Sequence, residues 1–134
     1  MPANDNPVPG SVLAEVRTPT QAEFDLFAAL SGDDNPIHID PDFSKRTRFG
    51  RTVAHGMMLY AHLWALAHRR FPGARHVSQS LMFPNPAYAS DTIRFEVEVI
   101  DYPSSGRCRL ATRALRAGDG LPVCEGHVEL DLAP

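Results

Sequence analysis

The stretch "GMMLYAHLWALAHRR", residues 56–70, decides the fold because it is apolar almost all round. A helix with apolar residues on most of its sides is buried on most of its sides, and other parts of the chain must then cover it. No other segment of the sequence is apolar enough for this position. We therefore expect a helix from Gly56 to about Arg70, with the rest of the chain packed around it.

The segments that follow this helix have the alternation of β-strands. "TIRFEVEVI", residues 92–100, "RCRLATRAL", residues 107–115, and "CEGHVELDL", residues 124–132, each place apolar side chains on every second position. "VSQSLMF", residues 77–83, suggests a further strand, and "AGDG", residues 117–120, a turn. Alternation of this kind is typical of antiparallel strands with one buried face. The residues expected to point inward are Ile93, Phe95, Val97, Val99, Cys108, Leu110, Thr112, Ala114, Cys124, Val128, Leu130 and Leu132.

The elements expected before residue 56 are shorter. Residues 1–10 hold three prolines and predict a flexible lead-in, so that residues 11–134 form the single domain. "SVLAEV", residues 11–16, alternates like a short strand. Thr20 and Glu23 form a T-x-x-E capping box, which predicts a helix that ends at Gly32. Residues 40–50 are irregular, with at most one helical turn.

These elements together predict an α+β protein. A largely antiparallel sheet needs a cover for its apolar face, and the helix from Gly56 is the element that can supply it. A curved antiparallel sheet wrapped around a long central helix is the hot-dog fold. The hydrophobic pattern predicts the wrapping but not the order of the strands.

Composition excludes several classes of protein. The chain has 134 residues and a net charge of −3, which argues against general binding of nucleic acid. No apolar run approaches the length of a membrane span, and no secretory signal precedes the domain, so we expect a cytoplasmic protein. Cys108 and Cys124 have no metal-ligand spacing and are not opposite each other in the expected hairpin, and no His pair has the HExxH spacing. We therefore expect reduced cysteines, no metal and no cofactor.

Three motifs carry a family resemblance. "FAALSGDDNPIHID", residues 27–40, contains G-D-x-N-P-aliphatic-H directly after a helix. "FGRTVAHGMMLYAHL", residues 49–63, and "QSLMFPNPAYASDTIRFEVEV", residues 79–99, follow in order. Together they resemble the MaoC-like dehydratases and (R)-specific enoyl-CoA hydratases over most of residues 20–100. Ala87 and Ser90 depart from the family pattern, in which Val and Gly are usual, and these changes affect packing and a turn.

Asp33 and His38 are the candidate catalytic pair. Addition of water to the double bond of an enoyl thioester needs a held water, a base and a proton for the α-carbon, and a carboxylate with an imidazole can supply them. The resemblance implies that Asp33 and His38 are this pair, and either can deprotonate the water. The alternative is that Asp33 caps the next turn and His38 is an ordinary polar residue. Pro36 and Asn35 restrict the loop between them.

Further residues are candidates for holding the thioester. Gly56 begins the helix, where a free backbone N–H can stabilise the negative charge on the thioester oxygen, although Gly56 can also serve close packing. Arg48 and Arg51 belong to the basic run "KRTRFGR", residues 45–51, which suits the phosphates of coenzyme A or is a solvated loop. Tyr60 and Trp64 share the helix face of Gly56, and they narrow an acyl tunnel or belong to the core.

The resemblance also implies a substrate and a state of assembly. The expected reaction is the reversible hydration of trans-2-enoyl-CoA, or of the acyl-carrier-protein thioester, to the (R)-3-hydroxyacyl form. The expected assembly is a homodimer, with a heterodimeric dehydratase as the alternative. A hot-dog thioesterase usually presents a carboxylate from the central helix, and here that helix has none. A non-catalytic acyl-binding protein is expected to lack Asp33 or His38, and both are present.

Overall fold

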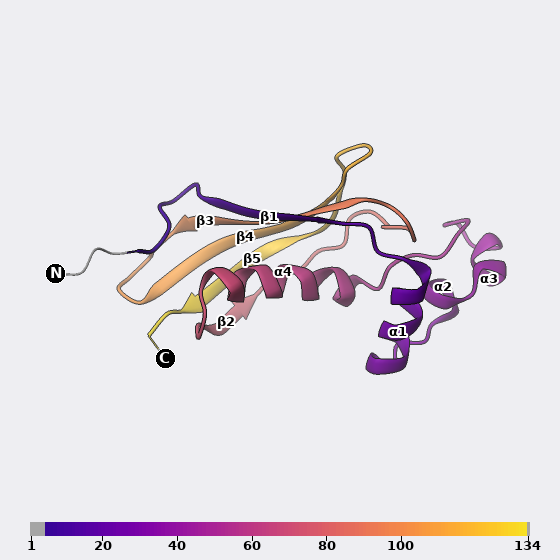
Figure 1. The fold of residues 1–134 in the computed structure, drawn as a ribbon, viewed down its shortest axis with the longest axis horizontal. Coiled ribbons are helices and arrows are strands. Elements are labelled where there is room, and N and C mark those ends of the chain that lie inside the picture. The colour runs from indigo at the N-terminus through magenta and orange to yellow at the C-terminus, as the bar shows by residue number, and fades with distance from the viewer. Residues whose placement is uncertain (1–4, 134) are drawn as a thin grey trace.

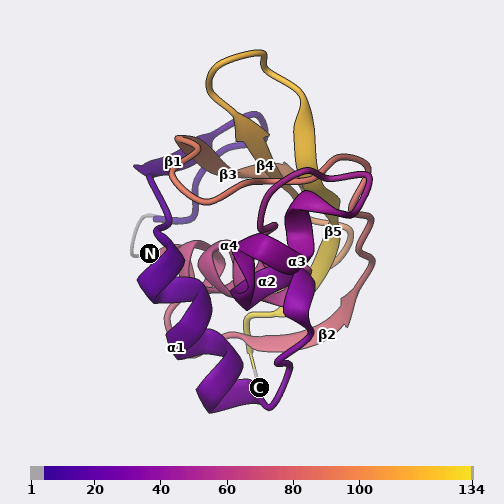
Figure 2. The ribbon, with the colours of Figure 1, turned by 90° about the vertical axis from the view of Figure 1, so that its right-hand side faces the viewer.

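The structure, a computed structural model, describes residues 5–133 and contains one five-stranded antiparallel sheet that wraps around a central helix (Figure 1). The order of the strands is β1-β3-β4-β5-β2. Seen end-on, the sheet curls over α4, and β2 reaches the opposite side of the helix from β1 (Figure 2). The prediction of an α+β hot-dog fold is therefore confirmed. The elements are β1 Val12–Arg17, α1 Gln21–Ser31, α2 Pro36–Ile39, α3 Pro41–Lys45, α4 Gly56–Arg70, β2 Arg75–Gln79, β3 Ile93–Asp101, β4 Arg107–Arg116 and β5 Pro122–Asp131.

The core lies between α4 and the concave face of the sheet. Leu59, Leu63 and Leu66 of α4 are almost completely buried, as are the inward-facing residues of the three long strands. The expected alternation is thus confirmed along β3, β4 and β5. One outward residue differs, because Glu96 of β3 is buried beneath Arg94 and Arg113, which donate to its two carboxylate oxygens at 2.7 and 2.6 Å.

The central helix is less enclosed than its composition suggests. The prediction that it is buried on most sides is wrong for four apolar positions. Met57 is 52 % exposed and Trp64 is 47 % exposed, and Ala61 and Ala65 are exposed as well. The reason is that a five-stranded sheet covers the helix on one side and at β2, while the remaining side has no second layer within residues 5–133. A single copy of the chain therefore leaves an apolar part of α4 uncovered.

The strand predicted over residues 77–83 needs a correction. β2 runs from Arg75 to Gln79, and the chain then continues beside β5 with only one isolated bridge, between Met82 and Glu125. The pairing of β2 with β5 also shifts between His76 and Ser78. An irregular register breaks the two-residue period on which the sequence prediction depended.

The other local predictions agree with the structure. Thr20 and Glu23 form the capping box of α1, and the helix ends at Gly32, which has the left-handed φ of 80°. Cys108 lies opposite Leu130 and Cys124 opposite Ala114, and both cysteines are free. Residues 1–4 of the expected lead-in lie outside the described residues. In its remaining part, Gly10 donates to Val99 O at 2.8 Å.

Within residues 5–133, no helix is both long enough and apolar enough to cross a bilayer.

Candidate active site

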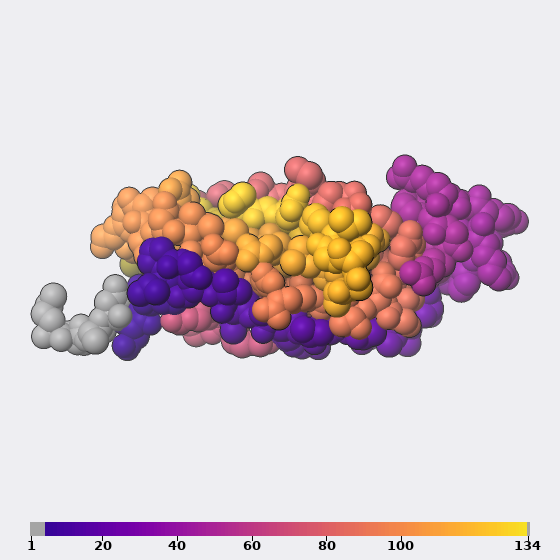
Figure 3. Space-filling model, turned by 90° about the horizontal axis from the view of Figure 1, so that it is seen from above, coloured from indigo at the N-terminus to yellow at the C-terminus, as the bar shows by residue number. Residues whose placement is uncertain are grey.

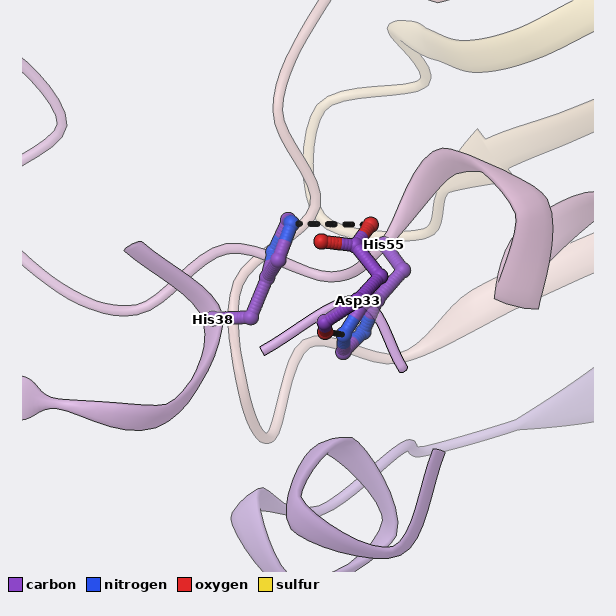
Figure 4. A group of neighbouring side chains, drawn as sticks. All are labelled: Asp33, His38 and His55. Carbon is purple, nitrogen blue, oxygen red and sulfur yellow. Dashed lines mark hydrogen bonds and ion pairs between the residues drawn. The ribbon is translucent and has the colours of Figure 1, made fainter. Parts of the chain in front are cut away.

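The end of α1 and the short helix α2 bring Asp33 and His38 together. Gly32 ends α1 in the left-handed conformation, so that the chain turns back and presents Asp33. Asn35 then caps α2 by accepting a hydrogen bond from Ile37 N at 3.1 Å, and Pro36 occupies the first helical position. His38 lies on this short helix and points back toward Asp33 (Figure 4).

The ring of His38 has a defined orientation and tautomer. His38 is 8 % exposed, and its Nδ1 lies 2.7 Å from the carbonyl oxygen of Val53. A carbonyl oxygen only accepts, so Nδ1 carries the proton and the lone pair of Nε2 faces Asp33. Neutral His38 is thus a proton acceptor on the side where the carboxylate lies.

The distance between the Asp33 carboxylate and the His38 imidazole fits one bridging water. Nε2 of His38 and Oδ2 of Asp33 are 3.8 Å apart, which is too long for a direct hydrogen bond. A single water at about 2.8 Å from each atom bridges such a gap. Nowhere in residues 5–133 does a donor lie within hydrogen-bond distance of the Asp33 carboxylate, which is 55 % exposed.

The segment before α4 is tied to the same loop. Val53 N donates to Ile37 O at 2.9 Å, and Ala54 N donates to Ala87 O at 2.7 Å. Gly56 begins α4, and its N–H makes no hydrogen bond in the described part of the chain. Such an N–H at a helix N-terminus is available to an oxyanion. The ring of Phe83 lies 2.8 Å from where a Cβ would be at position 56, so a larger residue there would have to displace this half-exposed ring.

These groups line one pocket of ≈ 380 Å³. The volume is within the range of small-molecule sites, and most of the surrounding side chains are apolar with few polar groups among them. Asp33, His38, Arg48 and Gly56 are the predicted site residues that line it. The other lining residues are Ile37, Phe49, Val53, Ala54, Met57, Leu59, Phe83, Pro84, Asn85, Pro86, Ala87 and Val123.

The chain is similar to a known family over most of its length. The model of the family described as "MaoC like domain" matches residues 4–116. The chain belongs to the MaoC-like dehydratase family. An (R)-specific enoyl-CoA hydratase of Aeromonas caviae is 39 % identical over 108 residues, which are 76 % of this chain and 78 % of the relative.

Two further comparisons agree with this family. A mitochondrial 3-hydroxyacyl-[acyl-carrier-protein] dehydratase of Arabidopsis thaliana is 36 % identical over 121 residues, which are 88 % of this chain and 73 % of the relative. The solved structure of an (R)-hydratase from A. caviae involved in PHA biosynthesis superposes with a TM-score of 0.89 and 31 % identity. That superposition covers 96 % of this chain and 98 % of the other. The relatives thus include proteins named for a CoA thioester and for a carrier-protein thioester.

His55 is a residue of this MaoC-like site that the sequence prediction passed over. Its ring stacks on His38 with centroids 3.9 Å apart and an interplanar angle of 24°. Its Nε2 lies 2.9 Å from Asp33 O (Figure 4). The available signal was its position directly before Gly56, because a pocket that holds Gly56 together with Asp33 and His38 brings His55 close to the same loop.

Asp33, His38 and His55 bring one possible metal-ligand atom each to within 4.8 Å of the others. The stacked rings nevertheless oppose metal binding, because the lone pairs of two nearly parallel imidazoles do not converge on one point about 2.0 Å from each nitrogen. His38 Nδ1 and His55 Nε2 already face carbonyl oxygens, and His55 Nδ1 is buried. The arrangement is suited to holding a water rather than an ion.

Three predicted site residues lie away from the pocket of the MaoC-like domain. Arg51 stacks on Tyr88 at 4.1 Å and pairs with Asp91 at 3.5 Å, so it faces a separate cleft. The hydroxyl of Tyr60 lies 3.2 Å from His76 Nε2, and the indole of Trp64 stacks on His68 at 4.0 Å. The side chains of Tyr60 and Trp64, one and two turns of α4 beyond Gly56, therefore lie beside β2 and not beside Asp33.

Proposed function

We propose that this protein adds water to the double bond of trans-2-enoyl thioesters to form (R)-3-hydroxyacyl thioesters, and catalyses the reverse dehydration. The observation that carries the proposal is the 3.8 Å gap between Asp33 and His38, at a pocket that also holds the free N–H of Gly56. A hydratase needs these three groups at one site: two for the water and one for the thioester oxygen. Family membership and the names of the relatives support the same reaction.

The chemistry follows from the placement of the groups. In the proposed reaction, the water in the gap gives a proton to one of the two acceptors, and its oxygen forms a bond to the β-carbon. The electron pair of the double bond then moves toward the thioester carbonyl, whose oxygen becomes negative and is stabilised by the N–H of Gly56. The enolate then collapses and its electron pair bonds the α-carbon to the proton that the acceptor took from the water. Both residues return to their starting state, and the sum of the reaction is the addition of one water.

The test is a panel of trans-2-enoyl-CoAs with increasing chain length. Purified protein is incubated with each substrate, the loss of enoyl absorbance is followed, and the configuration of the product is determined by chiral chromatography. We expect hydration with a 3R product. Release of free CoA without a change at the double bond supports the thioesterase alternative, and a 3S product contradicts the proposed placement of the water.

Arg48 is proposed to bind a phosphate of the thioester carrier. Among the arginines of residues 5–133, only Arg46, Arg48 and Arg70 have no carboxylate at ion-pair distance. Arg46 and Arg48 lie in the segment after α3, which projects from the body of the molecule (Figure 3), and Arg48 lines the pocket. Because Arg51 is already paired with Asp91, the proposal for Arg51 has less support.

Arg48→Gln is therefore expected to raise KM for enoyl-CoA about tenfold or more with little change in kcat, because a charge-assisted contact contributes ~1.5–3 kcal/mol. Arg70→Gln is the matched control, since Arg70 also lacks a carboxylate partner but lies at the far end of α4. Steady-state kinetics at two salt concentrations measure the effect, and high salt should reduce the difference between the variant and the wild type. Equal KM values for the two variants would contradict the phosphate contact.

A homodimer is the proposed assembly. Within residues 5–133, β2 pairs only with β5, so its outer edge is free. The exposed Val77 lies on β2, and the exposed Trp64 lies on the face of α4 beside it. Exposed strand edges are usually covered in folded proteins. Pairing of two copies along β2 covers the exposed β2 edge of each copy. Sedimentation velocity measures the assembly, and a purified monomer would favour the heterodimeric alternative.

A cytoplasmic location is likewise a proposal, supported by the free cysteines Cys108 and Cys124.

We propose that an acyl chain bound in the pocket extends along α4 past Gly56, so that its far end reaches Trp64, and this role has a direct test. We expect Trp64→Ala to shift kcat/KM toward longer enoyl chains, with an effect of ~1–3 kcal/mol for each accommodated methylene. The melting temperature should change little, because the indole is half exposed and is not part of the buried core. The chain-length panel and a thermal melt are measured on the same preparation. An unchanged profile would exclude the indole from the acyl site.

A further inference from the structure

His55 contacts or adjoins each of the three residues that the proposed reaction uses: Asp33, His38 and Gly56. Its Nε2 lies 2.9 Å from the main-chain oxygen of Asp33, its ring stacks on the ring of His38, and it is the N-cap residue of the helix that begins at Gly56 (Figure 4). It is 1 % exposed, so substrate does not reach it. Its influence on the reaction must therefore pass through its neighbours.

The hydrogen bond to Asp33 fixes the tautomer of His55. Since a carbonyl oxygen only accepts, Nε2 carries the proton and Nδ1 has the lone pair. That Nδ1 is buried and has no partner in the described residues. Burial also lowers the pKa of His55, which keeps the ring neutral. A buried polar atom without a partner is unfavourable and needs an explanation.

A purely structural role does not explain the choice of histidine. The side chain of His55 makes no capping bond to α4, which Ser, Thr, Asp or Asn would supply at this position. As a filler between the rings of Phe24 and Phe27, phenylalanine would pack without leaving a bare nitrogen. What histidine adds, and phenylalanine lacks, is the N–H directed at Asp33.

We propose that His55 is a positioning residue: its ring supports the imidazole of His38 and its N–H holds the main chain of Asp33, so that the 3.8 Å gap between carboxylate and imidazole is kept. This inference rests on the proposed hydratase function. Asp33 lies in an exposed loop, and its other hydrogen bond there is the short-range one from its N–H to Ser31 Oγ at 3.1 Å. Without the bond from His55, the carboxylate is free to move away from the water.

Two variants separate the two contacts of His55. His55→Phe keeps a ring against His38 but has no donor, and His55→Gln keeps a donor at a similar reach but has no ring. We expect His55→Phe to lower kcat about 10²-fold, as a displacement of about 1 Å does, with KM nearly unchanged. Its melting temperature should stay equal or rise, because the bare Nδ1 is removed. His55→Gln should recover part of the lost kcat.

The matched control is His127→Phe, which adds the same side chain at an exposed histidine of β5 and should leave kcat unchanged. Rates are expressed per folded molecule, so that loss of folded protein does not count as loss of kcat. If His55→Phe retains wild-type kcat per folded molecule, or if kcat and stability fall together and His55→Gln rescues neither, His55 is structural and the inference is overturned.

A second measurement does not depend on activity. Nitrogen-15 NMR of the histidine rings in the wild-type protein should show a protonated Nε2 and an unprotonated Nδ1 for His55, with slow exchange of the Nε2 proton. The opposite tautomer removes the bond to Asp33 and overturns the inference even where hydratase activity is present. A wild-type protein that hydrates no enoyl-CoA instead overturns the proposed function, and the NMR result then decides the His55 contact by itself.

Discussion

Asp33→Asn is expected to abolish hydration and to leave the fold intact. The substitution keeps the size of the side chain, and the carboxylate is half exposed and accepts no hydrogen bond from the described residues, so that little stability depends on it. Loss of an acceptor for the proton of the water removes a factor of ~10²–10⁴ in rate. The loss should appear in kcat.

His38 requires a more careful substitution, because it is buried and not merely a loop residue. His38→Ala should also abolish hydration, but it leaves the carbonyl of Val53 without its partner, which costs ~1–3 kcal/mol. His38→Asn is the better variant, since the amide nitrogen of Asn can replace Nδ1 as the donor to Val53 O. We expect His38→Asn to lose activity with a melting temperature close to that of the wild type. Near-wild-type turnover of either Asp33→Asn or His38→Asn would remove that residue from the proposed mechanism.

Gly126→Ala is expected to cause the largest loss of stability. Gly126 lies in β5 opposite Thr112, and the chain that leaves β2 crosses directly over it. A Cβ at this position would lie 1.8 Å from the main-chain oxygen of Ser80. Ser80 has little freedom to move, because its N–H donates to His127 O at 2.9 Å and its hydroxyl accepts from His127 N at 3.0 Å.

The clash must therefore separate two backbones. Overpacking of this kind costs ~3 kcal/mol or more, and for a chain of this length that lowers the melting temperature by about 10 °C. Gly118→Ala is the control, since no atom lies within 4 Å of its Cβ position. Thermal melts of the two variants give the comparison. Similar melting temperatures for Gly126→Ala and Gly118→Ala would show that the chain does not cross β5 at this point.

The local elements of this protein were predictable because each depends on neighbours in the sequence. The apolar run of residues 56–70, the alternation along residues 92–100, 107–115 and 124–132, and the Thr20 capping box all encode burial or hydrogen bonding within one element. The pairing of Asp33 with His38 belongs to the same class, since His38 follows Asp33 by five positions and lies on a short helix that begins at Pro36. Ser90, which stands where the family usually has Gly, keeps the backbone conformation that glycine favours, with a left-handed φ of 71°.

Only the tertiary structure decided the contacts between residues that lie far apart in the sequence. His55 reaches Asp33 across twenty-two positions, Ser80 crosses Gly126, and Asp91 takes Arg51 away from the pocket. The exposure of Trp64 has the same origin, because periodicity predicts which residues share a helix face but not which element covers that face. The sequence by itself thus determined the central helix, most of the strands and the loop that brings Asp33 close to His38. The folded chain decided which side chains meet at the site, because those contacts depend on strand order and register, which local patterns do not encode.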